Sequence, residues 1–170
     1  MWCTAVKRML VCVEIVAAFG WGGQVIAAPA ETEASVVARL YKDFGWQAFA
    51  SQRELFGEVL QHQDKAVLRR YFAPSLVELL IHDSICQIKE HGICLLDFDI
   101  LFDSQDPVIT DLEVQRQSSG KVQIRFKDPT NGQAREIEFL VVRLAGQWKI
   151  ADILYRTKAE PSLKRILLRR

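Results

Sequence analysis

Residues 121–132 read KVQIRFKDPTNG, and this stretch decides the fold class that the sequence predicts. Val122, Ile124 and Phe126 alternate with polar side chains, which is the two-residue period of a strand with one buried face. The Asn131-Gly132 dipeptide is a strong signal for a β-hairpin turn. The stretch therefore predicts a strand that turns back into a second, antiparallel strand.

The same alternation continues on both sides of this stretch. Residues 107–114 have a period of two, and Ser118-Ser119-Gly120 supplies a turn before the next strand. Residues 134–144 and 147–156 predict two further strands, joined by Ala145-Gly146. The second half of the chain therefore predicts a four-stranded antiparallel meander.

Helical periodicity precedes the strands. Apolar residues recur at spacings of three and four over residues 36–44 and again after Asp64, and Pro74 begins a third helix that Gly92 ends. Helices followed by a meander indicate an α+β fold, with the helices covering one face of a curved sheet. The third helix is expected to bury the stripe Val77, Leu80, Ile81, Ile85 and Ile88.

The first 30 residues have the pattern of a cleavable signal peptide. Lys7 and Arg8 precede an apolar stretch from Met9 to Ile26, and Ala28 and Ala30 fit the cleavage pattern. Glycines interrupt this stretch before the roughly 20 apolar residues that a membrane span requires. The sequence therefore predicts export to the periplasm, with cleavage near Ala30.

Composition and charge fit one globular domain over residues 31–160, because 49% of the chain is hydrophobic and 25% is charged. Without Lys7, Arg8 and Glu14 the chain keeps 20 basic and 20 acidic side chains, so no nucleic-acid partner is expected. Residues 161–170 form a basic amphipathic tail. We expect a frayed, solvated terminus, with weak contact to a membrane surface as the alternative.

Two stretches resemble a known superfamily. The order of three helices and a meander that ends in GQWKIADILY, residues 146–155, resembles the cone-shaped nuclear transport factor two-like superfamily. Residues 96–106, LDFDILFDSQD, are similar to the segment that marks the exported domain of unknown function 3828 within it. The resemblance implies a cone whose mouth, between sheet and helices, serves catalysis, ligand binding or protein contact. Fold alone does not choose among these.

Two cysteines and two histidines, His82, Cys86, His91 and Cys94, lie within 13 residues. A structural zinc site would need all four to converge, with both cysteines as thiolates. In an oxidising compartment, a cysteine late in a helix and another just after the Gly92 stop can instead form a disulfide. The preferred prediction is a structural Cys86–Cys94 disulfide and no metal.

Four carboxylates follow, at Asp97, Asp99, Asp103 and Asp106. Their spacing lacks the central glycine and terminal glutamate of a calcium loop, so turn and cap roles are preferred over a bound cation. Together with Gln105, Asp97 and Asp106 are expected to hydrogen-bond backbone amides ahead of the first strand. Asp97, Asp99, Gln105 and Asp106 are also candidates for a pocket or a partner contact.

The last strand supplies three more candidates, Trp148, Asp152 and Tyr155. Strict alternation places Asp152 on the same side as Trp148, Ile150 and Leu154. It is therefore either a core-facing carboxylate that needs a partner, such as an arginine of a neighbouring strand, or a polar group that lines the cone.

Export and the resemblance together predict a non-enzymatic periplasmic binding protein without a cofactor, because no serine or cysteine has a nucleophile-elbow context. Some exported proteins of this kind resemble immunity proteins, which capture an antibacterial effector that a secretion system delivers into the periplasm. The expected partner is therefore a cognate toxic effector. The alternative is a small-ligand-binding protein or isomerase-like enzyme that uses the cone pocket, with Asp152 and Tyr41 or Tyr71 as polar anchors.

Overall fold

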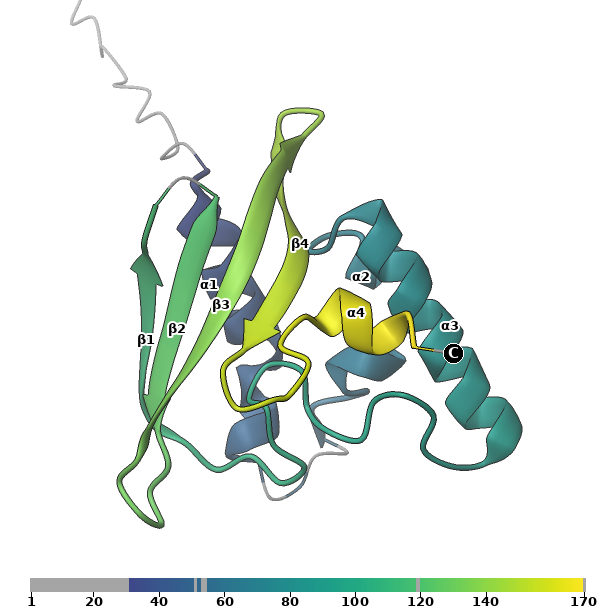
Figure 1. Cartoon of the computed structure of the whole chain (residues 1–170), viewed down its shortest axis with the longest axis horizontal. Coiled ribbons are helices and arrows are strands. Elements are labelled where there is room, and N and C mark those ends of the chain that lie inside the picture. The colour runs from purple at the N-terminus through teal and green to yellow at the C-terminus, as the bar shows by residue number, and fades with distance from the viewer. Residues whose placement is uncertain (1–30, 51, 53–54, 119, 170) are drawn as a thin grey trace, which may run out of the picture.

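The computed structural model describes residues 31–50, 52, 55–118 and 120–169 (Figure 1). Helices come first, and four strands follow in one antiparallel sheet of order β1-β2-β3-β4. The α+β class and the meander are therefore confirmed. The predicted signal peptide, residues 1–30, lies outside the described residues.

The sheet follows the alternation in the sequence. Its strands are β1 (Thr110–Arg116), β2 (Lys121–Lys127), β3 (Ala134–Leu144) and β4 (Gln147–Tyr155). The turn before β2 requires glycine, because Gly120 has a φ of 77° and a Cβ there would lie 3.0 Å from the Val141 carbonyl oxygen. That approach lets the Val141 amide donate to the Gly120 carbonyl at 2.7 Å.

One helix covers the inner face of the sheet, and three others lie beside β4 (Figure 1). The covering helix is α1 (Glu33–Phe44), which begins with a capping box between Thr32 and Ser35. The others are α2 (Lys65–Leu68), α3 (Pro74–Glu90) and α4 (Leu163–Leu167). The described residues also form the short 3₁₀ turns η1 (Gly45–Ala48) and η3 (Leu60–His62). Within the described part of the chain, every helix falls short of what crossing a bilayer demands.

Backbone hydrogen bonds join the connection between α2 and α3 to the edge of the sheet. The segment 71–73 between these helices runs beside β4 and forms a parallel bridge from Phe72 to Ile150. The Ala73 amide donates to the Ile150 carbonyl, and the Ile150 amide donates to the Tyr71 carbonyl, both at 2.8 Å. At the free edge of β4, a chain segment about 80 residues away therefore satisfies the backbone N–H and C=O of Ile150.

The apolar stripe predicted for α3 is only half right. Leu76, Val77 and Leu80 are buried, whereas Ile85 and Ile88 are 59% and 71% exposed. In the second half of the helix the core-facing position belongs to a carboxylate instead.

That carboxylate is Asp83, which is buried because it has partners. It accepts the Leu95 amide and the Gln87 side-chain amide, both at 2.8 Å. Asp83 takes the inward position of the helix where the chain after α3 runs back along it. The later apolar side chains, Ile85 and Ile88, therefore face outward.

A disulfide joins the end of α3 to the chain that follows. Cys86 and Cys94 are bonded, with their Cα atoms 6.2 Å apart, as predicted. The bond uses both sulfurs that the zinc alternative required as thiolates. The helix ends one residue earlier than expected, because His91 rather than Gly92 adopts the left-handed conformation, with φ of 51°.

The C-terminal segment is folded rather than frayed. Leu163, Ile166 and Leu167 of α4 are buried, and the helix packs against α3 and β4. Its first turn is capped by the Ser162 hydroxyl, which accepts the Arg165 amide at 3.2 Å. The expectation of a solvated tail is wrong because the apolar side of this amphipathic segment finds a place in the core.

The disulfide predicts a measurable stability term. Replacing both cysteines (Cys86→Ala with Cys94→Ala) removes the constraint on the unfolded chain and is expected to lower the free energy of unfolding by roughly 2–3 kcal/mol. Urea unfolding followed by circular dichroism measures the difference. A reductant should destabilise the native protein by a similar amount and leave the double variant unchanged; equal midpoints for native protein and variant would contradict the prediction.

Candidate functional site

The aspartate-rich segment, residues 96–106, contributes part of the core beside α1 and β4. Ile100, Leu101 and Phe102 are fully buried. The Tyr41 hydroxyl donates to the Leu101 carbonyl, and the Tyr155 hydroxyl donates to the Ile100 carbonyl at 3.0 Å. Tyr155, a predicted pocket residue, is therefore a core side chain that fixes this segment.

Burial raises the pKa of all three tyrosines of the chain. For Tyr41 and Tyr155 desolvation is the main cause, and nearby carboxylates such as Asp99 raise the pKa further. Desolvation likewise raises the pKa of Tyr71 to about 12, helped by its hydrogen bond to the Asp43 carboxylate. At neutral pH all three hydroxyls therefore remain protonated donors.

Asp152 lies on the opposite side of β4 from where alternation predicts it. Leu140 pairs with Asp152 but Val141 pairs with Ile150, so Ala151 is an extra residue in a β-bulge. The bulge shifts the alternation by one position, and Ile153 rather than Asp152 is buried.

The partners of Asp152 come from the C-terminal helix and not from an arginine. Its carboxylate accepts the Ser162 hydroxyl at 2.6 Å and the Lys164 amide at 3.0 Å. It also accepts the Ile153 amide at 2.9 Å. Asp152 therefore holds the beginning of α4 against β4.

Three other predicted residues, Asp97, Asp99 and Gln105, line one cleft of about 250 Å³ with His62 and Ile93. Asp97 and Gln105 are exposed there. Asp99 is partly buried, accepting the Leu101 amide at 2.7 Å and the side-chain amide of Gln47. The carboxylate that accepts a backbone amide is therefore Asp99, and its contacts shape the buried turn.

The two remaining carboxylates of the cluster lie apart from this cleft. Asp106 is exposed and lines a small hollow of about 90 Å³ with Arg135. Asp103 is buried, accepts the Thr157 hydroxyl and pairs with the Lys158 ammonium at 3.0 Å. The structure thus distributes the four carboxylates among three environments rather than gathering them at one centre.

A larger hollow of about 690 Å³ opens between α1, the end of α2 and the beginning of β4. Four cationic side chains line it, together with one carboxylate and one indole, and we call it the cationic hollow. These residues are Arg39, Arg69, Arg70, Lys149, Glu31 and Trp148. Of the residues predicted from the sequence, it contains Trp148.

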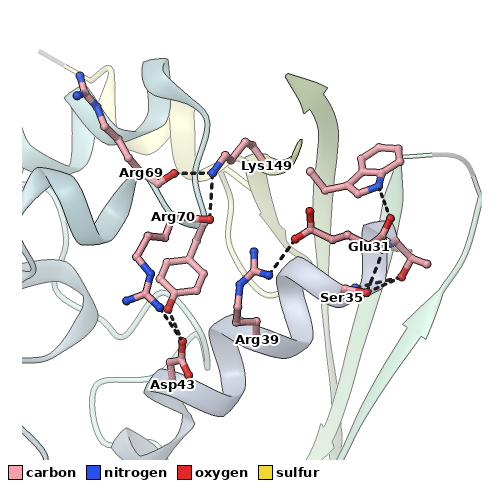
Figure 2. A network of polar contacts seen from close by, with 10 residues as sticks. Glu31, Ser35, Arg39, Asp43, Arg69, Arg70 and Lys149 are labelled. Atoms are coloured by element: carbon pink, nitrogen blue, oxygen red, sulfur yellow. Dashed lines mark hydrogen bonds and ion pairs between the residues drawn. The ribbon is translucent and has the colours of Figure 1, made fainter. Parts of the chain in front are cut away.

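Hydrogen bonds hold the walls of the cationic hollow (Figure 2). The Lys149 ammonium donates to the carbonyls of Arg69 at 2.7 Å and Arg70 at 3.1 Å, at the end of α2. The Arg39 guanidinium pairs with the Glu31 carboxylate at 2.9 Å, and the Trp148 indole donates to the Glu31 carbonyl at 3.0 Å. The cations are therefore positioned by three separate parts of the chain.

The surroundings of Lys149 in the cationic hollow affect its pKa. Burial lowers the pKa of the Lys149 ammonium, and the positive charge of Arg39 lowers it further. Sequence reasoning missed the hollow because Arg39, Arg69 and Lys149 are far apart in the chain. Within the sequence, the adjacent arginines at positions 69 and 70 were the local sign of a cationic site. The pairing of segment 71–73 with β4 brings them beside Lys149.

Comparison of the chain with protein-family models, curated proteins and solved structures finds no match. The resemblance to domain of unknown function 3828 therefore stays a prediction. The α+β architecture and the positions of the side chains rest on the structure alone.

The raised tyrosine pKa values predict a pH dependence of stability. In the unfolded chain tyrosine loses its proton near pH 10, whereas the folded protein holds it to higher pH. The stabilisation is complete below pH 10; the part due to Tyr71 is lost as pH rises from 10 through about 12, and the parts due to Tyr41 and Tyr155 are also lost above pH 10. Tyrosinate absorbance at about 295 nm should have a midpoint near 10 in urea and well above it in the native protein. A native titration at pH 10 would contradict the burial.

The cap on α4 predicts the effect of removing Asp152. Asp152→Ala leaves the Lys164 amide and Ser162 hydroxyl without this acceptor, and should cost about 1–2 kcal/mol of unfolding free energy. Hydrogen exchange should accelerate in α4 before it does in β2. Asp106→Ala removes an exposed carboxylate of the same kind and is the control, expected to change stability by less than about 0.5 kcal/mol. Equal effects of the two substitutions would contradict the capping role.

Proposed function

We propose that this chain is a non-enzymatic binding protein of the periplasm, an immunity protein that captures a toxic antibacterial effector. The observation that supports this proposal most is the packed interior, in which Ile100 and Leu101 are fully buried and their carbonyls accept the hydroxyls of Tyr155 and Tyr41. A core packed in this way leaves the outer surface for contacts with another molecule. A stable surface that meets one partner is what an immunity protein requires.

The disulfide agrees with the proposed compartment. Disulfides form and persist in oxidising environments such as the bacterial periplasm. The Cys86–Cys94 bond lies just before the aspartate-rich segment and restricts where that segment enters the core. The disulfide supports export, and so does the signal-peptide pattern of residues 1–30.

The cone-pocket alternative has less support. It needs Asp152 to converge with Tyr41 or Tyr71 around a ligand. Each of these side chains has its own partner: Asp152 caps α4, Tyr41 donates to Leu101, and Tyr71 donates to Asp43. An isomerase-like site would require these contacts to break.

Capture followed by growth rescue tests the proposed function. The full chain, tagged at its C-terminus and expressed in its native cell, is cross-linked and purified, and the captured proteins are identified by mass spectrometry. Each captured protein is then directed to the periplasm of a test strain. We expect one of them to arrest growth and the full chain to restore it.

The matched control is the same chain without residues 1–30, which keeps the folded residues in the cytoplasm. It should fail to restore growth if capture takes place in the periplasm. Rescue by this cytoplasmic form would contradict the proposed compartment. Purification of the full chain with a bound metabolite and no toxic protein would contradict the immunity function and favour the pocket alternative.

A further inference from the structure

The cationic hollow carries more positive charge than its own carboxylates neutralise. Four cations line it against one carboxylate, Glu31, which is already paired with Arg39. The nearest acids to the other two guanidiniums lie outside the lining: Asp43 is 3.8 Å from Arg70, and Glu78 is 3.9 Å from Arg69. Pairs this long and exposed contribute little. Arg69 and Arg70 can therefore exchange them for better partners.

These guanidiniums are also accessible and pre-positioned. The side chains of Arg69 and Arg70 are 57% and 60% exposed. The guanidiniums of Arg39 and Arg70 both lie over the ring of Tyr71, at 6.0 and 5.5 Å from its centre. A ligand that binds here would meet one accessible guanidinium, that of Arg70, which is already held over the ring, and this lowers the entropy cost of binding.

The backbone in the cationic hollow disfavours a compact phosphate. One common kind of phosphate site in proteins uses backbone N–H groups at the beginning of a helix. Here the end of α2 presents the carbonyl oxygens of Arg69 and Arg70, and Lys149 is occupied in neutralising them. Anion recognition is therefore left to separate guanidiniums around an opening of about 690 Å³.

A polypeptide with several carboxylates fits this arrangement better than one small anion. Each guanidinium offers a planar pair of donors that matches a carboxylate. The half-buried indole of Trp148 and the Ala66 side chain add apolar surface between the charges. Arginine beside tryptophan is also the composition in which protein interfaces are enriched.

We propose that the cationic hollow is the partner-binding site of this protein and that it takes an acidic polypeptide segment, whose aspartate or glutamate side chains pair with Arg69 and Arg70. This inference rests on the proposed binding function and adds the place and the chemistry of the contact. The exposed cleft at Asp97 and Gln105 carries negative charge and lies outside this contact.

A labelled peptide tests the site directly. The full chain is expressed in an exporting host, and the purified protein is titrated against fluorescein-labelled hexaglutamate by fluorescence anisotropy. Arg69→Gln with Arg70→Gln should weaken binding by about tenfold or more, because two charge-assisted hydrogen-bonding groups are lost while the carbonyls that hold Lys149 remain. Raising the salt concentration should weaken binding to the unmodified chain.

The matched control removes the same charge elsewhere. Arg125→Gln with Arg156→Gln acts on two arginines that pair with Glu136, outside the hollow, and should change binding by less than about twofold if location matters more than net charge. Circular dichroism checks that each variant is folded. If the double variant at 69 and 70 unfolds, the single substitution Arg69→Gln replaces it, with several-fold weaker binding expected. Equal loss in both double variants would overturn the proposal.

Two further probes test whether the cationic hollow prefers another anionic ligand to an acidic polypeptide. Inorganic phosphate and phosphatidylglycerol vesicles are tested as competitors of the peptide. The proposal expects weak competition that follows ionic strength alone. Tight binding of phosphate, or vesicle binding that depends on Arg69 and Arg70 and exceeds peptide binding, would overturn the polypeptide assignment, as would the absence of peptide binding.

The same variants separate this inference from the proposed function. If the Arg69→Gln, Arg70→Gln variant still captures the effector and restores growth, the cationic hollow is not the partner site although the immunity function stands. If no effector is found but peptide binding depends on these arginines, the site stands and the immunity function fails.

Discussion

The backbone pairing of segment 71–73 with β4 is the constraint on which the rest of this structure depends. A strand at the edge of a sheet carries N–H and C=O groups that need partners. Phe72 meets β4 at Ile150, and Ser162 meets it at Leu154, so two segments that lie far apart in the chain cover the edge at two places. The first contact positions the end of α2 and the beginning of α3, and the second positions α4.

These contacts also place polar chemistry on the surface. In the core, the carbonyls of the buried residues Ile100 and Leu101 accept the two buried tyrosine hydroxyls, so these polar groups are partnered inside the protein. The cationic hollow, in contrast, opens where α2 ends against β4 (Figure 2). Lys149 neutralises the end of α2 and leaves the arginine side chains facing outward. A solid core with an ordered charged opening is suited to contact with another chain.

The errors of sequence reasoning occur where a polar contact or a bulge interrupts a regular period. Asp152 was expected beside Ile150, but the extra residue Ala151 moves it to the side that meets α4. Ile85 and Ile88 fit the helical stripe and are nevertheless exposed, because Asp83 takes the inward position with two hydrogen bonds. Periodicity describes an element as if it were uniform, whereas its burial depends on what the neighbouring segments supply.

The local features of the fold could be predicted from the sequence alone. These are the alternation in β2, the Asn-Gly turn, the apolar face of α1 and the disulfide between two cysteines eight residues apart. Each depends on residues close together in the chain, where side-chain period, turn conformation and short loop closure act directly. Only the tertiary structure decided the place of the cationic hollow. Its cations come from α1, from the end of α2 and from β4, and what joins them is hydrogen bonding along a strand edge, which uses backbone groups common to every residue and therefore leaves no pattern in the sequence.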